Sequence, residues 1–269
     1  MADSQTPATQ QPKVSISNFL NMPKTRNFLE ETLAERRTEF VSNLIAMCDS
    51  DANLAACDPA ALMKCAMNAT ALNLPLNKNL GYAYVIPYKH NGIQVPQFQI
   101  GYKGLNQLAI RTGAYRYINA TEVREGEIKR NKITGELTII GEFPQKKVVG
   151  FIAYLELMTG FSASLYMSEE QIEEHALRFS KMYAADKQYK TQKSKWSDPL
   201  ARPAMAKKTV LKGLLGTYGL MTTEFAKAFE ADNDNEVPSG SPRGYEDAEI
   251  IPQEEPEVHP DPVVEKVQI

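Results

Sequence analysis

Cysteine is scarce in this chain of 269 residues, which contains only three: Cys48, Cys57 and Cys65. The count is odd, and no two of them form a C-x-x-C pair. These absences exclude a disulfide scaffold and a standard zinc site, and they favour a reducing compartment such as the cytoplasm. Because all three fall in or beside expected helices, we expect them to be packing residues rather than ligands.

Long apolar runs are missing as well. No stretch approaches the roughly 18–20 apolar residues that a membrane span needs. The N-terminal stretch has neither the basic region nor the apolar region of a secretory signal. We therefore expect no membrane association.

The motifs of several enzyme classes are absent. The run Lys-Lys-Thr at 207–209 lacks the glycines that precede it in a phosphate-binding loop, and the three histidines have no metal-ligand spacing. Glu122, Glu125 and Glu127 are the only carboxylate cluster near the expected strands, and at this spacing they would not converge on a metal unaided. We therefore expect no catalytic residue, no cofactor and no metal, with a metal nuclease as a minor alternative.

The charge is unevenly distributed along the chain. The net charge is -3, but residues 230–269 hold 12 acidic and 2 basic residues, so the remainder carries a net positive charge. Residues 178–212 alone hold 10 basic and 2 acidic residues. Such asymmetry favours a polyanionic partner, and the alternative is a solvated lysine-rich surface with a solubilising tail.

The order of expected elements indicates an α+β fold. Helical spacing predicts helices at about 24–48 and 58–72, the second capped by Asp58 and followed by Pro59. Residues 81–100 alternate as a β-hairpin, a short helix follows at 102–111, and the strands after it indicate a mainly antiparallel sheet with a basic hairpin near 128–140. Helices are then predicted from Ser168 to about 185, from Pro203, and over 223–231, with a loop at 185–199.

The ends of the chain differ from its middle. Residues 1–14 are polar, and residues 233–269 are rich in proline and glutamate, so we expect a disordered N-terminal segment and a flexible acidic tail. Between them, 15–232 forms one expected core.

Cationic residues alternate with flat side chains in one segment, 181–196, whose series is Lys181, Tyr183, Lys187, Tyr189, Lys190, Lys193, Lys195 and Trp196. Single-stranded nucleic acid requires phosphate neutralisation and faces on which bases stack, and this series supplies both. The alternative is a mobile loop whose aromatic residues attach it to the body.

Further basic residues surround two expected helices. Lys207, Lys208 and Lys212 lie on the late helix, and Lys103 and Arg111 bracket the short helix at 102–111. Lysines on a solvated face are common, so this pattern alone is weak. Other basic residues lie on the expected hairpin and its flank: Lys129, Arg130, Lys132, Lys146 and Lys147.

At these residues the chain resembles the RecT family of phage and prophage single-strand annealing proteins, over about 28–230. The resemblance is carried by LNLPLNKNLGYAYVIPY (72–88), QFQIGYKGLNQLAIRTG (97–113), EVREGE (122–127) and MAKKTVLKGLL (205–215). It implies a DNA-binding and oligomerisation core that forms rings or helical filaments and anneals single strands without ATP. It also implies a 5′-to-3′ exonuclease partner, and location in the cytoplasm of a bacterial host cell.

By matching position, the resemblance makes Lys103, Lys207, Lys208 and Lys212 the expected phosphate contacts. The remaining candidates for DNA binding are Gln99, Tyr102, Arg111, Lys193, Lys195 and Trp196. The acidic tail could compete with DNA or dock a partner such as host single-strand-binding protein, or it could do neither. The alternative function is a passive protein that covers and protects single strands without pairing them.

Overall fold

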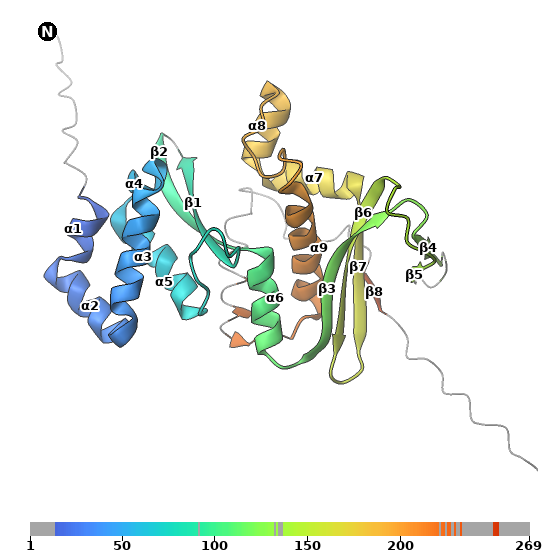
Figure 1. Ribbon diagram of the computed structural model, residues 1–269, viewed down its shortest axis with the longest axis horizontal. Helices are drawn as coiled ribbons and strands as arrows, with labels where there is room; N and C mark the ends of the chain where they lie inside the picture. The colour runs from blue at the N-terminus through green and yellow to red at the C-terminus, as the bar shows by residue number, and fades with distance from the viewer. Residues whose placement is uncertain are drawn as a thin grey trace, which may run out of the picture. The chain divides into compact units, whose positions relative to one another are not determined.

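The structure, a computed structural model, describes residues 14–90, 92–131, 133, 137–220, 222, 223, 225, 226, 229, 232 and 250–252. The chain divides into two compact units (Figure 1). The N-terminal unit comprises residues 1–112 and 220–243, and the sheet unit comprises residues 113–219 and 244–269. The elements are helical first, then mainly strands, then helical, so the expected α+β class is confirmed.

The N-terminal unit begins with a series of short helices. These are α1 (Ile16–Leu20), α2 (Pro23–Leu33), a 3-10 turn (Ala34–Arg36), α3 (Arg37–Asp49), α4 (Ala52–Ala55) and α5 (Pro59–Ala71). The single helix predicted over 24–48 is wrong, because Ala34 adopts a φ of 46° and breaks it. The break turns the chain so that Leu29 on α2 and Phe40 on α3 both reach one core.

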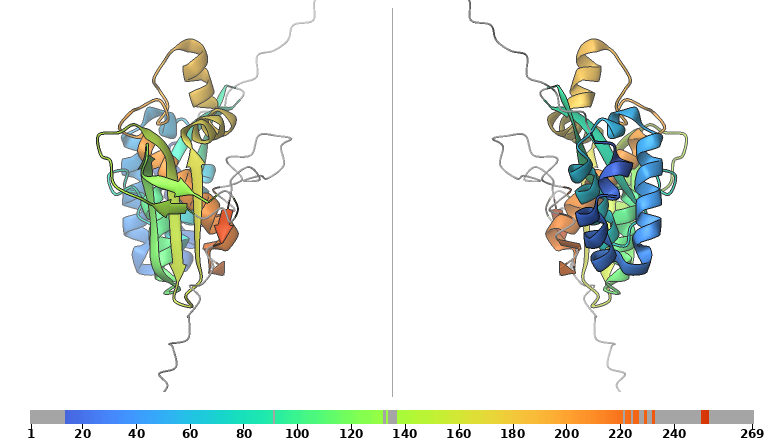
Figure 2. Two further views of the ribbon diagram at one scale, coloured as in Figure 1. Left: turned by 90° about the vertical axis from the view of Figure 1, so that its right-hand side faces the viewer. Right: turned by 90° about the vertical axis from the view of Figure 1, so that its left-hand side faces the viewer.

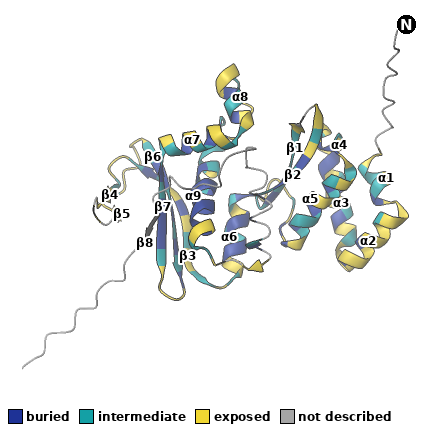
Figure 3. Cartoon of the chain, turned by 180° about the vertical axis from the view of Figure 1, so that it is seen from behind, coloured by how far each residue is buried: buried dark blue, intermediate teal, exposed yellow. Residues whose placement is uncertain are grey.

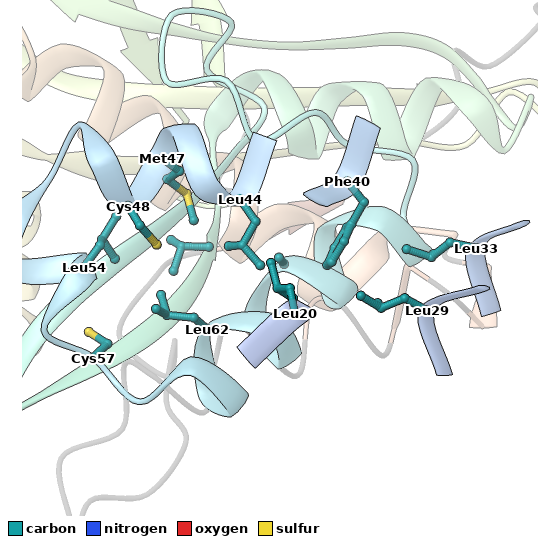
Figure 4. Packing of buried hydrophobic residues seen from close by; sticks show 12 residues of the cluster. Leu20, Leu29, Leu33, Phe40, Leu44, Met47, Cys48, Leu54, Cys57 and Leu62 are labelled. Carbon is teal, nitrogen blue, oxygen red and sulfur yellow. The ribbon is translucent and has the colours of Figure 1, made fainter. Parts of the chain in front are cut away.

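That core gathers apolar side chains from all of these helices (Figure 4). Leu20, Leu54 and Leu62 have at most 1% of their surface exposed. Cys48 and Cys57 are buried among them and Cys65 is half-buried, and none of the three forms a disulfide. Burial, with Asp49 nearby, raises the pKa of the Cys48 thiol to about 11, which keeps it protonated at neutral pH. The packing role predicted for the cysteines therefore agrees with their positions.

A hairpin and a helix follow the short helices in the N-terminal unit. Strands β1 (Ala83–His90) and β2 (Ile93–Ile100) pair antiparallel, and α6 (Tyr102–Arg111) follows directly. Gly101 and Gly104 are needed here, since a Cβ on either would lie 2.2 or 2.1 Å from the backbone oxygen of Gly81 or Tyr82. The two glycines of the GYKG sequence therefore let the 81–82 backbone pack against the start of α6.

The sheet unit is built on strands in the order β3-β6-β7-β8, all antiparallel. The strands are β3 (Tyr115–Arg124), β6 (Val148–Leu157), β7 (Ser162–Ser168) and β8 (Ile250–Pro252). Phe151, Ala153 and Leu155 of β6 are buried on one face. Helix α9 (Arg202–Tyr218) packs along β3, β6 and β7 (Figure 2). A small separate hairpin, β4 (Ile128–Arg130) with β5 (Leu137–Ile139), interrupts the chain between β3 and β6.

Two helices stand where the sequence predicts one helix and a loop. Helix α7 (Glu169–Phe179) begins with the predicted capping box of Ser168 and Gln171. It ends before Ser180, whose extended backbone and hydroxyl cap a second helix, α8 (Lys181–Tyr189). Residues 185–189 are therefore helical, and the loop starts only at Lys190. The local signal missed here is the cap: Ser180 Oγ accepts the N–H of Tyr183 at 3.2 Å.

Several sequence predictions concern the chain ends and one turn. Residues 1–13, 132, 134–136, 233–249 and 253–269 lie outside the described residues, and with them most of both predicted flexible segments and the turn of the basic hairpin. Within the tail, Ile250 and Pro252 pair with Leu165 and Ala163 of β7, so this part forms a strand. Of the predicted 223–231 helix, residues 223, 225, 226 and 229 are described and helical. Among the helices of the described ranges, none has the length and apolar character to cross a membrane.

Candidate nucleic-acid interface

In the N-terminal unit the candidate residues lie at the junction of β2 and α6. Lys103 is exposed on the first turn of α6, whereas Tyr102 and Gln99 are half-buried. Gln99 Nε2 donates to the Tyr88 hydroxyl at 2.9 Å across the hairpin. Of these three candidates, Lys103 is thus the one with a charged side chain exposed to solvent.

Arg111, at the other end of α6, has a structural task. Its Nη1 donates to the Leu72 carbonyl at 2.8 Å and its Nη2 to the Asn73 carbonyl at 3.2 Å. These acceptors follow the end of α5, where helix carbonyls lack partners within the helix. The guanidinium therefore joins α6 to the end of α5, and the remaining N–H groups are what it can offer to a phosphate.

In the sheet unit, the lysines of α9 differ from the predicted exposed stripe. Lys207 is half-buried, but Lys208 has 8% and Lys212 only 1% of its surface exposed. Helix α9 has buried residues on nearly every side, among them Ala206 and the run 208–215, as the dark blue helix in Figure 3 shows. The exposed stripe expected for Lys208 and Lys212 does not fit this burial, and their role as phosphate contacts stays a prediction.

The segment after α8 divides between surface and core. Lys193 and Lys195 are exposed, but Trp196 has only 6% of its surface exposed. The Trp196 ring centroid lies 6.3 Å from that of Tyr183 and 6.5 Å from that of His175. The stacking role expected for Trp196 does not fit, since its ring faces are covered by the protein. The alternative reading, in which aromatic residues attach this segment to the body, describes Trp196 correctly.

A buried carboxylate holds the segment in place. Asp186 is 4% exposed, and its Oδ2 accepts the backbone N–H of Lys193 at 2.9 Å and of Ser194 at 2.7 Å, and the Ser197 hydroxyl at 2.6 Å. Its Oδ1 accepts the hydroxyl of Thr191. Burial works against ionisation, but these hydrogen bonds, led by the one from Ser197, outweigh it and hold the pKa of Asp186 well below its usual range. The loop that carries Lys193 and Lys195 is therefore anchored at both ends.

A second carboxylate joins the three helices of this region. Glu173 of α7 accepts the Tyr183 hydroxyl at 2.6 Å and pairs with Lys187 of α8 at 2.7 Å and with Arg202 of α9 at 3.3 Å. Arg202 also pairs with Glu169 at 2.8 Å. Burial raises the pKa of Glu173, but the hydrogen bonds from Lys187 and Tyr183 lower it by more. The pKa of Glu173 therefore lies below its ordinary value. Lys187 is thereby partly neutralised within the protein.

The carboxylates considered for a nuclease have structural partners. Glu122 pairs with Arg124 at 2.5 Å. Glu127 accepts the N–H of Phe143 at 2.9 Å and of Arg124 at 2.7 Å, and these bonds lower its pKa. Across the described residues, no group of three or more histidine, cysteine or acidic side chains is placed to hold a metal ion. Nothing at these glutamates favours the metal nuclease.

The basic hairpin is only partly described. Lys129, Lys146 and Lys147 are exposed beside it, while Lys132 at its turn lies outside the described residues. These exposed cations belong to the sheet unit, as do Lys193, Lys195 and Lys207. Lys103 belongs to the N-terminal unit.

Tyr189 belongs to the lysine and aromatic series of 181–196 but is not among the predicted DNA-binding residues. Tyr189, the last residue of α8, has 69% of its surface exposed. The sequence predicts a loop at 185–199, so it does not indicate that Tyr189 lies on a helix. The signal that distinguishes it is helical spacing, since Met182 and Tyr189 are seven residues apart and lie on the same side of α8.

The sequence is similar to one protein family and to two known proteins. The sequence matches the RecT family over residues 38–249. It is 35% identical to the uncharacterised protein YqaK of Bacillus subtilis (strain 168) over 249 residues, which cover 91% of this chain and 81% of that protein. It is 26% identical to Protein RecT of Escherichia coli (strain K12) over 170 residues, which cover 59% of this chain and 62% of that protein. The family match spans well over half of the sequence, and the chain belongs to the RecT family of DNA recombination and annealing proteins.

Proposed function

We propose that this protein anneals complementary single DNA strands without ATP in phage-type homologous recombination. The observation that carries the proposal is the match to the RecT family over residues 38–249. The exposed lysines of both units support it, because a protein that brings two polyanions together must neutralise their phosphates. The chain acts as a binding protein in this proposal and performs no chemical step.

Among the candidates, the residues that we propose for phosphate contact are the lysines with an exposed or half-buried side chain: Lys103, Lys193, Lys195 and Lys207. Gln99 and Tyr102 flank Lys103 and are assigned a secondary role. A strand held by its backbone in a basic groove leaves its base edges free for the incoming strand. Lysine contacts of this kind do not read sequence, so we expect sequence-independent binding that weakens steeply with salt.

The free energy for annealing comes from the DNA itself. Each base-pair step of a new duplex contributes on the order of 1.4 kcal/mol through stacking and pairing. The protein needs to supply only alignment and charge neutralisation, which explains why it can work without a nucleotide-binding motif.

We propose that the protein acts as a homo-oligomer, a ring or a helical filament on DNA, together with a 5′-to-3′ exonuclease that exposes the strand. Its three cysteines, none of them in a disulfide, fit the cytoplasm of a bacterial host. The acidic tail competes with DNA for the lysines, docks a partner such as host single-strand-binding protein, or does neither and only solubilises the protein. Deleting residues 253–269, which keeps strand β8 in place, tests competition: tighter DNA binding indicates it, and unchanged binding leaves docking or no role.

The function is tested by mixing complementary oligonucleotides with the full chain, without ATP or divalent metal, and following both pairing and strand length. We expect pairing faster than the spontaneous rate, with intact strands. Slower pairing would identify a passive protecting protein, and shortened strands a nuclease. Repeating the assay with Lys103→Ala and Lys193→Ala, against Lys24→Ala as an exposed-lysine control on α2, tests the assignment of the phosphate contacts. Unaltered rates in both variants would contradict that assignment.

A further inference from the structure

Helix α8 and the loop after it, residues 181–198, form a segment that we call the α8 arm. The helix ends at Lys190, which adopts the left-handed conformation (φ 54°) and donates its N–H to the Asp186 carbonyl. The loop then returns over Asp186, whose carboxylate accepts four hydrogen bonds from Thr191, Lys193, Ser194 and Ser197. Trp196 closes the loop by packing beside Tyr183. The arm is thus a preorganised platform, which keeps low the entropy cost of ordering it on a ligand.

The outer surface of this platform carries flat and apolar groups between cations. Met182 is 46% exposed and Tyr189 69% exposed, and Ala185 lies between them on the same side of the helix. Lys181 and Lys190 are exposed and adjoin these residues in the chain. An exposed aromatic ring between lysines combines a flat face with positive charge, and this combination favours an anionic ligand with planar groups.

We propose that the α8 arm is a base-stacking site: an unpaired DNA base stacks on the ring of Tyr189, and the neighbouring phosphates lie on Lys190 and Lys193. This inference rests on the proposed function, namely that the chain binds single-stranded DNA, and it adds a contact to the bases that the lysines alone do not provide. Ring and base stack without reading base identity, so the site is sequence-tolerant. Stacking covers a face of the base and leaves its pairing edge free, so a base held on Tyr189 can still meet the incoming strand.

The charge around a second exposed tyrosine makes it the matched control. Tyr117 on β3 is 60% exposed, close to the value for Tyr189. Its cross-strand partner is Glu156, whose carboxylate accepts Arg116 at 2.9 Å and the Tyr154 hydroxyl at 3.1 Å. No exposed lysine adjoins Tyr117 in the sequence, and a carboxylate beside it repels phosphates. Tyr117 therefore offers a ring of similar exposure whose adjoining cation, Arg116, is already paired with Glu156.

The test compares Tyr189→Ala, Tyr189→Phe and Tyr117→Ala in the full chain, with a thymidylate oligomer and an abasic oligomer of equal length as probes. We expect Tyr189→Ala to bind the thymidylate oligomer about fivefold or more weakly and the abasic oligomer as the unaltered protein does, because only the base contact is lost. Tyr189→Phe retains the ring and should bind both oligomers normally, as should Tyr117→Ala. Since Tyr189 is largely exposed, Tyr189→Ala should leave the fluorescence of buried Trp196 unchanged, which verifies the fold.

The outcomes separate this inference from the proposed function. If the unaltered protein binds thymidylate oligomers and Tyr189→Ala binds them equally well, the stacking site is wrong and single-strand binding stands. If Tyr189→Ala weakens both oligomers to the same extent, the residue supports the lysines rather than a base, and the inference is again wrong. If the unaltered protein binds no single-stranded DNA, both fail. A direct readout is Tyr189→Trp combined with Trp196→Phe, in which the indole fluorescence should be quenched by the thymidylate oligomer but not by the abasic one.

Discussion

Helix α9 and the α8 arm are neighbouring lysine-rich segments of the sheet unit, but their lysines differ in exposure to solvent. In α9, Lys208 and Lys212 are almost fully buried. In the α8 arm, Lys190, Lys193 and Lys195 are exposed. The segment with the more specific family motif therefore buries two of its three lysines, whereas the segment supported only by composition exposes its lysines.

The difference follows from what each segment packs against. Helix α9 packs along three strands of the sheet, and its residues 208–215 are buried without interruption. A helix that is buried on nearly every side belongs to the core, whatever charges it carries. The α8 arm contributes only Tyr183, Asp186, Ser194 and Trp196 to the interior. We conclude that the MAKKTVLK sequence serves the architecture of the unit before it serves any ligand.

The largest loss of stability that this comparison predicts comes from replacing Trp196. Trp196→Ala should lower the free energy of unfolding by about 3–5 kcal/mol, because it removes a buried ring from the base of the α8 arm. Urea denaturation followed by circular dichroism measures this loss. Trp196→Phe, which keeps an aromatic ring, should recover most of the stability. An unchanged urea midpoint together with lost DNA affinity would instead mean that Trp196 is a stacking residue.

The second prediction concerns Lys212, the most buried lysine of α9. Lys212→Ala should lower the free energy of unfolding by about 1–3 kcal/mol, since it empties the space of a fully buried side chain and removes its polar interactions. Lys207→Ala, on the half-buried side of the same helix, should change stability by no more than about 0.5 kcal/mol. If the two variants unfold at the same urea concentration, the buried position of Lys212 is not its position in solution.

Local sequence signals predicted much of the fold. Asp58 caps α5 through Ala61 N–H, and Ser168 with Gln171 forms the capping box of α7, as their residue types indicate. The alternating residues of 81–100 form the hairpin β1–β2. In these cases the interaction partners lie within four residues, or in a directly adjoining strand, so the pattern itself contains the answer.

The misjudged features depend on contacts that no short window contains. Ala34 breaks the predicted 24–48 helix although alanine favours helices, because the turn lets both halves reach one core. Trp196 is buried because Tyr183 and Asp186 shape its site, and Lys208 is buried because α9 packs on the sheet. For the candidate site, residue types indicated the segments correctly, but which side chains reach solvent is decided by tertiary packing.

The third prediction uses the pKa of Asp186. Its folded-state pKa lies below the ordinary value of about 4, so its stabilising effect is fully present above that value and is lost as the pH falls through the folded-state pKa. Asp186→Asn should therefore be less stable than the unaltered protein at pH 7, and the difference should shrink as the pH is lowered toward 3. Glu173, whose pKa is also lowered, contributes the acid dependence that remains in the variant.

Urea denaturation at a series of pH values measures this difference. Asp198→Asn is the matched control, because Asp198 lies in the same loop and its Oδ1 accepts a single N–H, that of Leu200 at 2.9 Å. It should show a small difference from the unaltered protein at pH 7. A difference between Asp186→Asn and the unaltered protein that stays constant from pH 7 to pH 3 would exclude ionised Asp186 as the anchor of the arm.

The smallest effect on stability is expected at the exposed lysines of the arm. Lys193→Ala and Lys195→Ala should each change the free energy of unfolding by no more than about 0.5 kcal/mol, because both side chains are exposed and their removal leaves no cavity. Each should nevertheless weaken binding to single-stranded DNA and reduce the slope of log affinity against log salt by about 0.7 for one lost phosphate contact. Binding titrations at several salt concentrations give that slope. A lower affinity with an unchanged slope would place these lysines outside phosphate contact, and the comparison with α9 would then concern folding alone.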